Sequence, residues 1–120
     1  MPATYSIHVE RKLVISRAWG VMTSADVRGH RRALRGDPLF DRTYRELLDM
    51  SGITEDLVDL GAKQELSQDQ LFTPGVRRAW VAPADYAFGM ARMYAIAAEK
   101  QGQVIGVFRT MSEAEEWLGL

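Results

Sequence analysis

The chain has 120 residues, of which 47% are hydrophobic and 26% are charged, and its formal net charge at pH 7 is −1. These values are typical of one globular domain, residues 1–120, and the near-zero charge excludes a general attraction to nucleic acid or anionic membranes. The absence of cysteine excludes a disulfide framework and a thiolate metal site. No apolar run has the length of a signal peptide or a membrane span, so we expect a cytoplasmic protein.

The start of the chain predicts a β-hairpin. Apolar and polar residues alternate over residues 5–10 and again over 13–19, which is the period of half-buried strands. The polar pair Arg11 and Lys12 separates the two segments and suits a tight turn. Gly20 is expected to end the second strand.

A helix is predicted over residues 24–35. Thr23 or Ser24 is suited to the N-cap position, because a hydroxyl oxygen can accept a hydrogen bond from a free backbone N–H of the first turn. Gly36 and Pro38 follow the last helical residue, and neither residue type continues a helix well.

The middle of the chain contains a third strand and then an ambiguous stretch. Residues 44–50 predict the strand, and Ser51 and Gly52 are expected to end it. In residues 53–70 the leucines are loosely spaced and Gly61 interrupts them, which indicates a broken helix.

The last third of the chain alternates strands and helices. Strands are predicted over residues 77–82 and 104–109 and a long helix over 85–100. Ser112 and Glu115 have the spacing of a capping box that begins a final short helix. The order predicts an α/β domain: a mixed sheet of about five strands with an N-terminal β-hairpin, parallel crossovers and about four helices.

The helix over residues 85–100 has two apolar stripes. One stripe comprises Tyr86, Met90, Met93 and Ala97, and the other comprises Ala87, Ala91, Tyr94 and Ala98. Because one stripe is enough to cover the sheet, the other needs a different partner. Burial under residues 53–70, a subunit interface and the wall of an apolar pocket are the alternatives. The interface reading predicts a homodimer with Met90 to Tyr94 in or near the contact.

Polar residues follow the predicted third and fourth strands. Asp49 and Asp85 lie near the carboxyl ends of these strands, where ligands bind in open α/β sheets. With Ser51, Thr54 and Tyr86 they would line a small polar crevice; capping and turn formation is the alternative explanation for the aspartates and serine. The candidate ligand or partner site therefore comprises Asp49, Ser51, Thr54, Asp85, Tyr86, Met90, Met93 and Tyr94.

The first predicted helix carries a row of arginines on one face: Arg28, Arg31, Arg32 and Arg35. The row indicates either an anion-binding patch or a solvated face balanced by nearby aspartates. We expect the solvated face, and no nucleic-acid partner, because no second basic element is near it in the chain.

Histidines are rare, with His8 on a predicted strand and His30 on a predicted helix. Neither has a companion at metal-ligand spacing, and no nucleophile elbow is present. The sequence therefore predicts no metal, no cofactor and no catalytic residue.

Short motifs at the ends of the predicted elements resemble those of the STAS-like family, whose fold is that of bacterial anti-sigma-factor antagonists. The motifs are Asp37-Pro38-Leu39-Phe40-Asp41, Leu48-Asp49 with Ser51-Gly52-Ile53-Thr54, Val81-Ala82-Pro83, the helix start from Tyr86 to Tyr94, and Glu113-Ala114 with Trp117-Leu118. They are most similar to a branch of small, mostly uncharacterised bacterial members and span nearly the whole chain. The resemblance implies a non-enzymatic interaction or regulatory module.

The family's phosphorylation switch, a Ser or Thr after the third strand, is not expected here. The chain keeps Asp49 and Ser51, but the acidic run over residues 55–59 stands where the family's serine-rich motif would follow. Two functional hypotheses remain. The chain is a dimeric interaction module that engages a protein partner or small apolar ligand, or it is a small-molecule-binding or catalytic protein with an apolar pocket beside the helix over residues 85–100.

Overall fold

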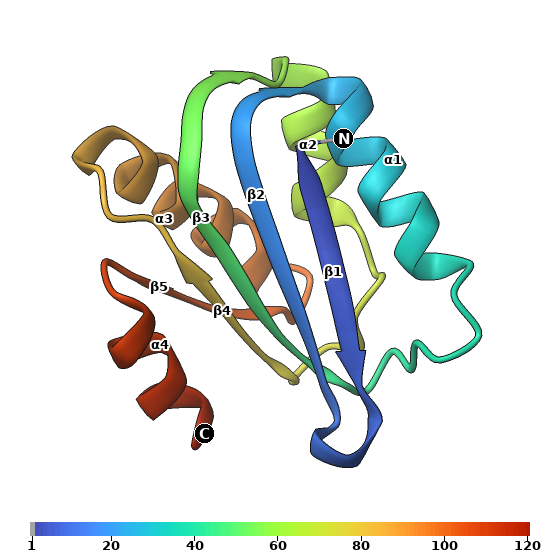
Figure 1. The fold of residues 1–120 in the computed structure, drawn as a ribbon. Coiled ribbons are helices and arrows are strands. Elements are labelled where there is room, and N and C mark those ends of the chain that lie inside the picture. Colours follow the sequence, from blue (N-terminus) through green and yellow to red (C-terminus); the bar gives the residue numbers. More distant parts are fainter. Residues whose placement is uncertain (1) are drawn as a thin grey trace.

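Residues 2–120 of the computed structural model contain a sheet of five strands, each hydrogen-bonded to its neighbour in sequence (Figure 1). The strands are β1 (Ala3–His8), β2 (Leu13–Thr23), β3 (Arg45–Leu57), β4 (Arg77–Val81) and β5 (Val104–Phe108). β1 and β2 form an antiparallel hairpin around a 3-10 turn at Val9–Arg11, and the later pairs are parallel. The predicted mixed α/β sheet and its opening hairpin are confirmed.

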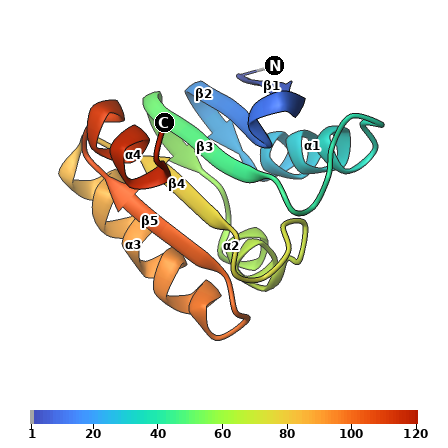
Figure 2. The ribbon, with the colours of Figure 1, turned by 90° about the horizontal axis from the view of Figure 1, so that it is seen from below.

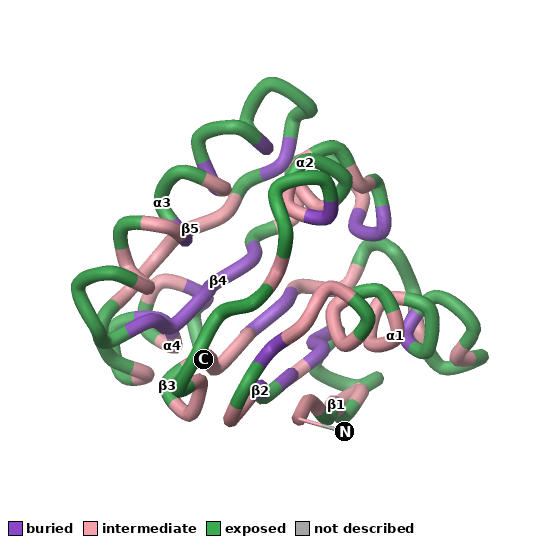
Figure 3. Tube along the Cα trace, turned by 90° about the horizontal axis from the view of Figure 1, so that it is seen from above, coloured by how far each residue is buried: buried purple, intermediate pink, exposed green. Residues whose placement is uncertain are grey.

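The helices are α1 (Ser24–Arg35), α2 (Leu60–Gln68), α3 (Asp85–Glu99) and α4 (Met111–Leu118). α4 packs on one face of the sheet, and α1, α2 and α3 lie on the other (Figure 2). Consecutive strand residues face opposite sides, so Leu47 of β3 joins the α4 side whereas Leu48 faces α3. Figure 3 shows the buried positions concentrated on the strands, with much of the outer surface of α3 exposed.

The long strands β2 and β3 extend beyond their predicted ends. β2 continues through Gly20, which has a φ of 69° beside a register shift, and β3 continues through Ser51 and Gly52. A Cβ atom on Gly52 would lie 2.9 Å from the Cβ atom of Trp19 on β2. Gly52 therefore permits close approach of the two strands, and the prediction that it ends a strand was wrong.

The stretch predicted as a broken helix is part strand and part helix. Residues 53–57 belong to β3, and α2 begins after Asp59, whose Oδ1 accepts a hydrogen bond from the backbone N–H of Ala62 at 2.7 Å. α2 covers the remainder of the predicted helical region and ends at Gln68. The N-cap residue Asp59 sets the start of the helix after the strand, because Asp at an N-cap stabilises the first helical turn.

Caps explain where the other helices begin. Thr23 and Asp26 form a capping box that begins α1, as predicted for Thr23. α4 begins at a box formed by Thr110 and Glu113, so the predicted pair of Ser112 and Glu115 was wrong by two residues.

Candidate functional site

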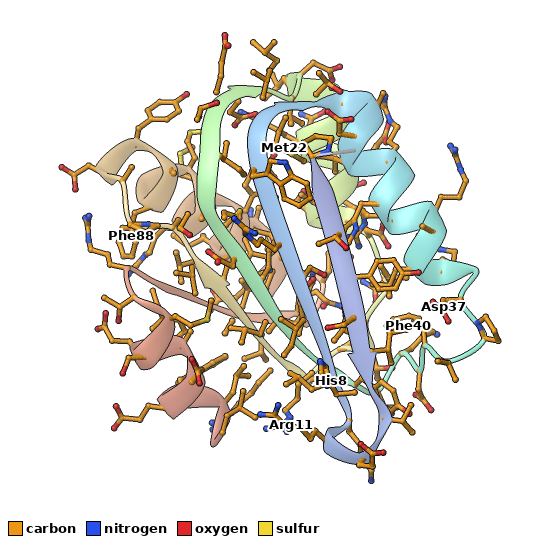
Figure 4. The ribbon with its side chains drawn as sticks, viewed as in Figure 1. His8, Arg11, Met22, Asp37, Phe40 and Phe88 are labelled. Carbon is orange, nitrogen blue, oxygen red and sulfur yellow. The ribbon has the colours of Figure 1, made fainter. Side chains whose placement is uncertain are left out.

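A cleft of about 480 Å³ lies between the sheet and the helices α1, α2 and α3. Its apolar lining comes from the strands β1 to β4 and from all three helices. The main apolar residues are Met22, Val27, Leu48, Met50, Ile53, Leu66 and Met90. Figure 4 shows Met22 near the distal end of β2, close to the start of α1. This volume is within the range of small-molecule sites in proteins.

The core on this face of the sheet is divided into two clusters, and only one of them lines the cleft. On one side, Leu34 of α1 packs with Val14 and Phe72, and Phe40 meets the Phe72 ring edge-on at 5.4 Å between centroids (Figure 4). On the other side, α3 packs Ala91 against Trp80. The second cluster supplies Trp80 and Ala91 to the lining of the cleft, and α1 supplies Val27 and His30.

The floor of the cleft contains a buried polar network. Glu46 of β3 and Arg78 of β4 are paired by the sheet register and are 4% and 2% exposed. Glu46 Oε1 accepts hydrogen bonds from Arg78 Nε at 3.0 Å and from Trp80 Nε1 at 2.7 Å. Arg78 Nη1 also donates to Gln103 Oε1 at 3.0 Å, and Gln103 donates to the Phe72 carbonyl oxygen at 2.9 Å.

α1 contributes two further polar side chains to the cleft, His30 and Arg31. Burial lowers the pKa of His30, although the nearby Glu46 carboxylate acts in the opposite direction. The imidazole is therefore neutral at pH 7, and it meets the Tyr5 ring edge-on at 5.6 Å between centroids. Arg31 Nε donates to Asp69 Oδ2 at 2.7 Å.

Half of the predicted site residues come together at this cleft. Thr54, Tyr86, Met90 and Tyr94 all line it, from β3 and α3. Tyr94 meets the Trp80 ring edge-on at 6.2 Å between centroids, and burial raises the pKa of its phenol above the usual value. The predicted pocket beside this helix is therefore present as a structural feature.

The other predicted site residues lie elsewhere. Asp49 faces the α4 side of the sheet, and its Oδ1 accepts hydrogen bonds from the backbone N–H and hydroxyl of Ser51 at 2.9 and 2.6 Å. Asp85 is in the first turn of α3 rather than at its N-cap, and it pairs with Arg109 at 2.6 Å. Met93 is 65% exposed on the outer surface of α3. The predicted polar crevice does not form from the two aspartates.

The arginine row faces carboxylates in and just after α2. Arg28 pairs with Glu65 at 3.1 Å, and Asp69 pairs with Arg31 at 2.7 Å and with Arg35 at 3.3 Å. The prediction that nearby aspartates balance this row was wrong: Asp26 caps α1, Asp37 accepts a hydrogen bond from Tyr5, and the partners of the row come from a segment more than thirty residues away. These pairs connect α1 to α2 across one end of the cleft.

The polar floor was missed by sequence reasoning. Glu46 and Arg78 each stand beside an apolar residue on a strand, so alternation alone assigns them to the opposite face and predicts that this face is solvated. The available signal was their position in strands that are central to the sheet and covered by helices. Such strands leave no solvated face for a charge.

The other histidine is remote from this site. His8 lies at the hairpin end of β1 with Nε2 2.9 Å from Ser6 Oγ (Figure 4). Among residues 2–120, no cluster of three or more His, Cys, Asp or Glu side chains could hold a metal ion. In the same part of the chain, none of the helices combines the length and the apolar character needed to cross a bilayer.

Comparisons with known proteins identify the fold. No family model and no curated protein sequence matches the chain. A crystal structure of an uncharacterised DUF3478-family protein with a SpoIIAA-like fold, from Shewanella loihica PV-4, is similar over 97% of this chain and 93% of that one. The TM-score is 0.63 and the sequence identity is 17%. The resemblance drawn from the sequence motifs is thus confirmed at the level of architecture: the chain has the SpoIIAA-like, or STAS, fold.

Proposed function

We propose that this chain is a non-enzymatic binding module whose cleft takes a small, largely apolar molecule. The observation that supports the proposal most strongly is the cleft of about 480 Å³ with its apolar lining beside α3. A pocket of this kind, with a few polar groups at its floor, is the usual form of a small-molecule site. The cysteine-free sequence supports a cytoplasmic location for the module.

The composition of the walls favours an adaptable site. Met22, Met50 and Met90 contribute unbranched side chains that adjust to ligands of different shape. Trp80 and Tyr94 add aromatic surface. We expect the module to accept several related apolar molecules and to bind each with moderate affinity.

Two alanines of α3 provide a matched test. Ala87 lines the cleft, whereas Ala97 is exposed on the outer surface of the same helix. Ala87→Phe should fill part of the cleft and weaken binding of the neutral fluorescent probe N-phenyl-1-naphthylamine by roughly tenfold or more, whereas Ala97→Phe should leave the affinity unchanged. Equal probe affinity in the two variants, at equal thermal stability, would refute the cleft as the binding site.

A dimer is the second candidate, supported by the exposed apolar stripe of α3. Tyr86, Met93 and Ile96 are 72%, 65% and 57% exposed. Pairing two copies through this surface would remove it from water. Sedimentation equilibrium at micromolar concentration should report twice the chain mass of 13.5 kDa. Met93→Lys should return the monomer mass, and a wild-type mass of one chain across this range would eliminate the dimer.

A further inference from the structure

The ion pair of Glu46 and Arg78 is buried at the floor of the cleft, and a contribution to stability alone does not explain its burial. Glu46 and Arg78 lie side by side on parallel strands and are almost completely buried. A buried pair of charges loses much of its hydration, and well-packed apolar residues of similar volume often stabilise a fold as well or better. The pair therefore points to a role at the cleft, which Glu46 lines.

The network uses one side of the Glu46 carboxylate. Both of its hydrogen bonds, from Arg78 and Trp80, go to Oε1. None of residues 2–120 donates a hydrogen bond to Oε2. The fully buried side-chain atoms without a partner in this part of the chain are Ser16 Oγ and Arg31 Nη2, so Oε2 is not sealed from open space. The open space that Glu46 adjoins is the cleft.

The surroundings hold this acceptor in place. The Arg78 guanidinium lies over the Phe72 ring at 4.6 Å and is fixed on its other side by Gln103. Glu46 therefore keeps one orientation without help from a ligand. A rigid carboxylate oxygen at the floor of an apolar cleft selects a ligand that donates a hydrogen bond.

We infer that the ligand is an apolar alcohol whose hydroxyl donates a hydrogen bond to Glu46 Oε2 while its hydrocarbon part fills the cleft. This inference rests on the proposed function. Charge decides the type of head group. The charges around this floor are already paired, Glu46 with Arg78 and Arg31 with Asp69, so a carboxylate or an ammonium ligand would bring an additional charge that has no counter-charge of its own. An uncharged hydroxyl satisfies Oε2 and adds no charge to the buried network.

A pair of isomers tests the inference directly. Octan-1-ol and 1-methoxyheptane contain the same atoms, but the ether has no hydrogen-bond donor. Each is titrated against the wild-type protein loaded with N-phenyl-1-naphthylamine, together with octanoate and octylammonium. We expect octan-1-ol to displace the probe at a concentration at least tenfold lower than the ether and lower than either ion, the usual size of a hydrogen bond to a charged group.

Variants locate the acceptor. Glu46→Gln should reduce the preference for alcohol over ether to about threefold or less, because an amide oxygen is a weaker acceptor than a carboxylate. Glu55→Gln, which changes another carboxylate that lines the cleft, should leave the preference unchanged. The wild-type comparison needs no variant, so it decides the question even where Glu46→Gln fails to fold.

The outcomes separate the two proposals. Failure of the probe and of all four compounds to bind would overturn the proposed function. Probe binding with equal displacement by the alcohol and the ether would overturn this inference and leave the apolar site in place. Preference for octanoate or octylammonium would overturn the choice of head group in the same way.

Discussion

The two faces of the sheet are packed differently, although the same strands supply both. On the α4 side, Leu13, Leu47 and Val81 form one continuous cluster with Ala114 and Leu118 of α4. On the opposite side, the core is divided into two clusters, and a cleft adjoins the cluster under α3. Because side chains alternate along a strand, one face can supply stability while the other is free to form a site.

The covering helices account for the difference. α4 is short, but its Trp117 packs against Phe108 with 5.4 Å between ring centroids and lies under the Arg77 guanidinium at 5.1 Å. α3 buries the small residues Ala91 and Ala95, which bring its backbone close to the sheet without filling the space toward α1. α4 thus packs a large aromatic residue against its face of the sheet, whereas the buried residues of α3 are all alanines.

Neighbouring leucines on β3 give the largest expected effect and the sharpest test of this contrast. Leu47→Ala should lower the free energy of unfolding by about 3–4 kcal/mol, because Leu47 is 4% exposed in the filled core. Leu48→Ala should lower it by about 1–2 kcal/mol, because Leu48 is half-buried and already adjoins the cleft. Urea unfolding measures both, and equal losses would show that the two faces are packed alike.

Trp117→Ala should lower the free energy of unfolding by about 3 kcal/mol, the usual loss when an aromatic residue is truncated in a core. Trp19→Ala is the control. Trp19 is half-buried like Trp117, but its ring lies under Arg17 at 5.5 Å outside the core cluster that Trp117 joins, and its loss should cost about 1 kcal/mol. A denaturant midpoint that hardly moves in Trp117→Ala, with an unchanged m value, would show that α4 contributes little to its face.

The ion pairs at the end of the cleft should make stability depend on pH. Burial acts to raise the pKa of Asp69, but the hydrogen bond and charge of Arg31 outweigh it, so the pKa lies below its usual value. A carboxyl group with a lowered folded-state pKa stabilises the fold fully above its unfolded pKa, near about 4, and loses this contribution as the pH falls through the folded value. Asp69→Asn should therefore lower the free energy of unfolding by about 1–2 kcal/mol at pH 7.

The same difference should shrink as the pH falls through the folded-state pKa of Asp69, because the wild-type carboxyl then becomes protonated as well. Urea unfolding of both proteins across this range measures it. A gap between wild type and Asp69→Asn that stays constant with pH would contradict the assignment of the ion pairs to Asp69.

The smallest effects are expected at the two hydroxyls near the end of β3. Ser51 is exposed on β3 and its hydroxyl donates a hydrogen bond to Asp49 two residues earlier, so Ser51→Ala should change the free energy of unfolding by less than about 0.5 kcal/mol. Thr54→Ala should behave similarly. The acidic segment over residues 55–59 disfavours a phosphate here, and intact-mass measurement of protein from its host should find neither residue stoichiometrically phosphorylated.

The sequence predicted local structure well where a single residue decides it. Thr23, one of the two residues predicted for the cap, begins α1, and the opening hairpin follows from alternation and the polar turn. The ends of β2 and β3 were predicted wrongly because Gly20 and Gly52 serve a bulge and a close strand approach. These roles depend on the neighbouring strand, which the local sequence does not reveal.

Sequence reasoning identified the part of the candidate site that lies on one helix, but it missed the part formed by residues distant in the chain. Apolar periodicity identified Tyr86, Met90 and Tyr94, since it reports a helix face directly. The hydrogen bond between Glu46 and Arg78 joins residues 32 positions apart, and the link to Gln103 spans another 25. Hydrogen-bond partners this far apart in the chain meet only because of the order of the strands in the sheet. The residue types of the partners do not specify that order.

The order of the strands also shapes how the chain folds. Because each strand pairs with the one before it, the sheet can grow in chain order without inserting a later strand between earlier ones. α4 is an exception to this chain order, because the last helix packs against Leu13 of the first hairpin. The carbonyl oxygen of Leu118 in α4 also accepts a hydrogen bond from Arg45. Until α4 docks, a fully paired sheet presents a bare apolar face, the type of surface through which partly folded chains aggregate.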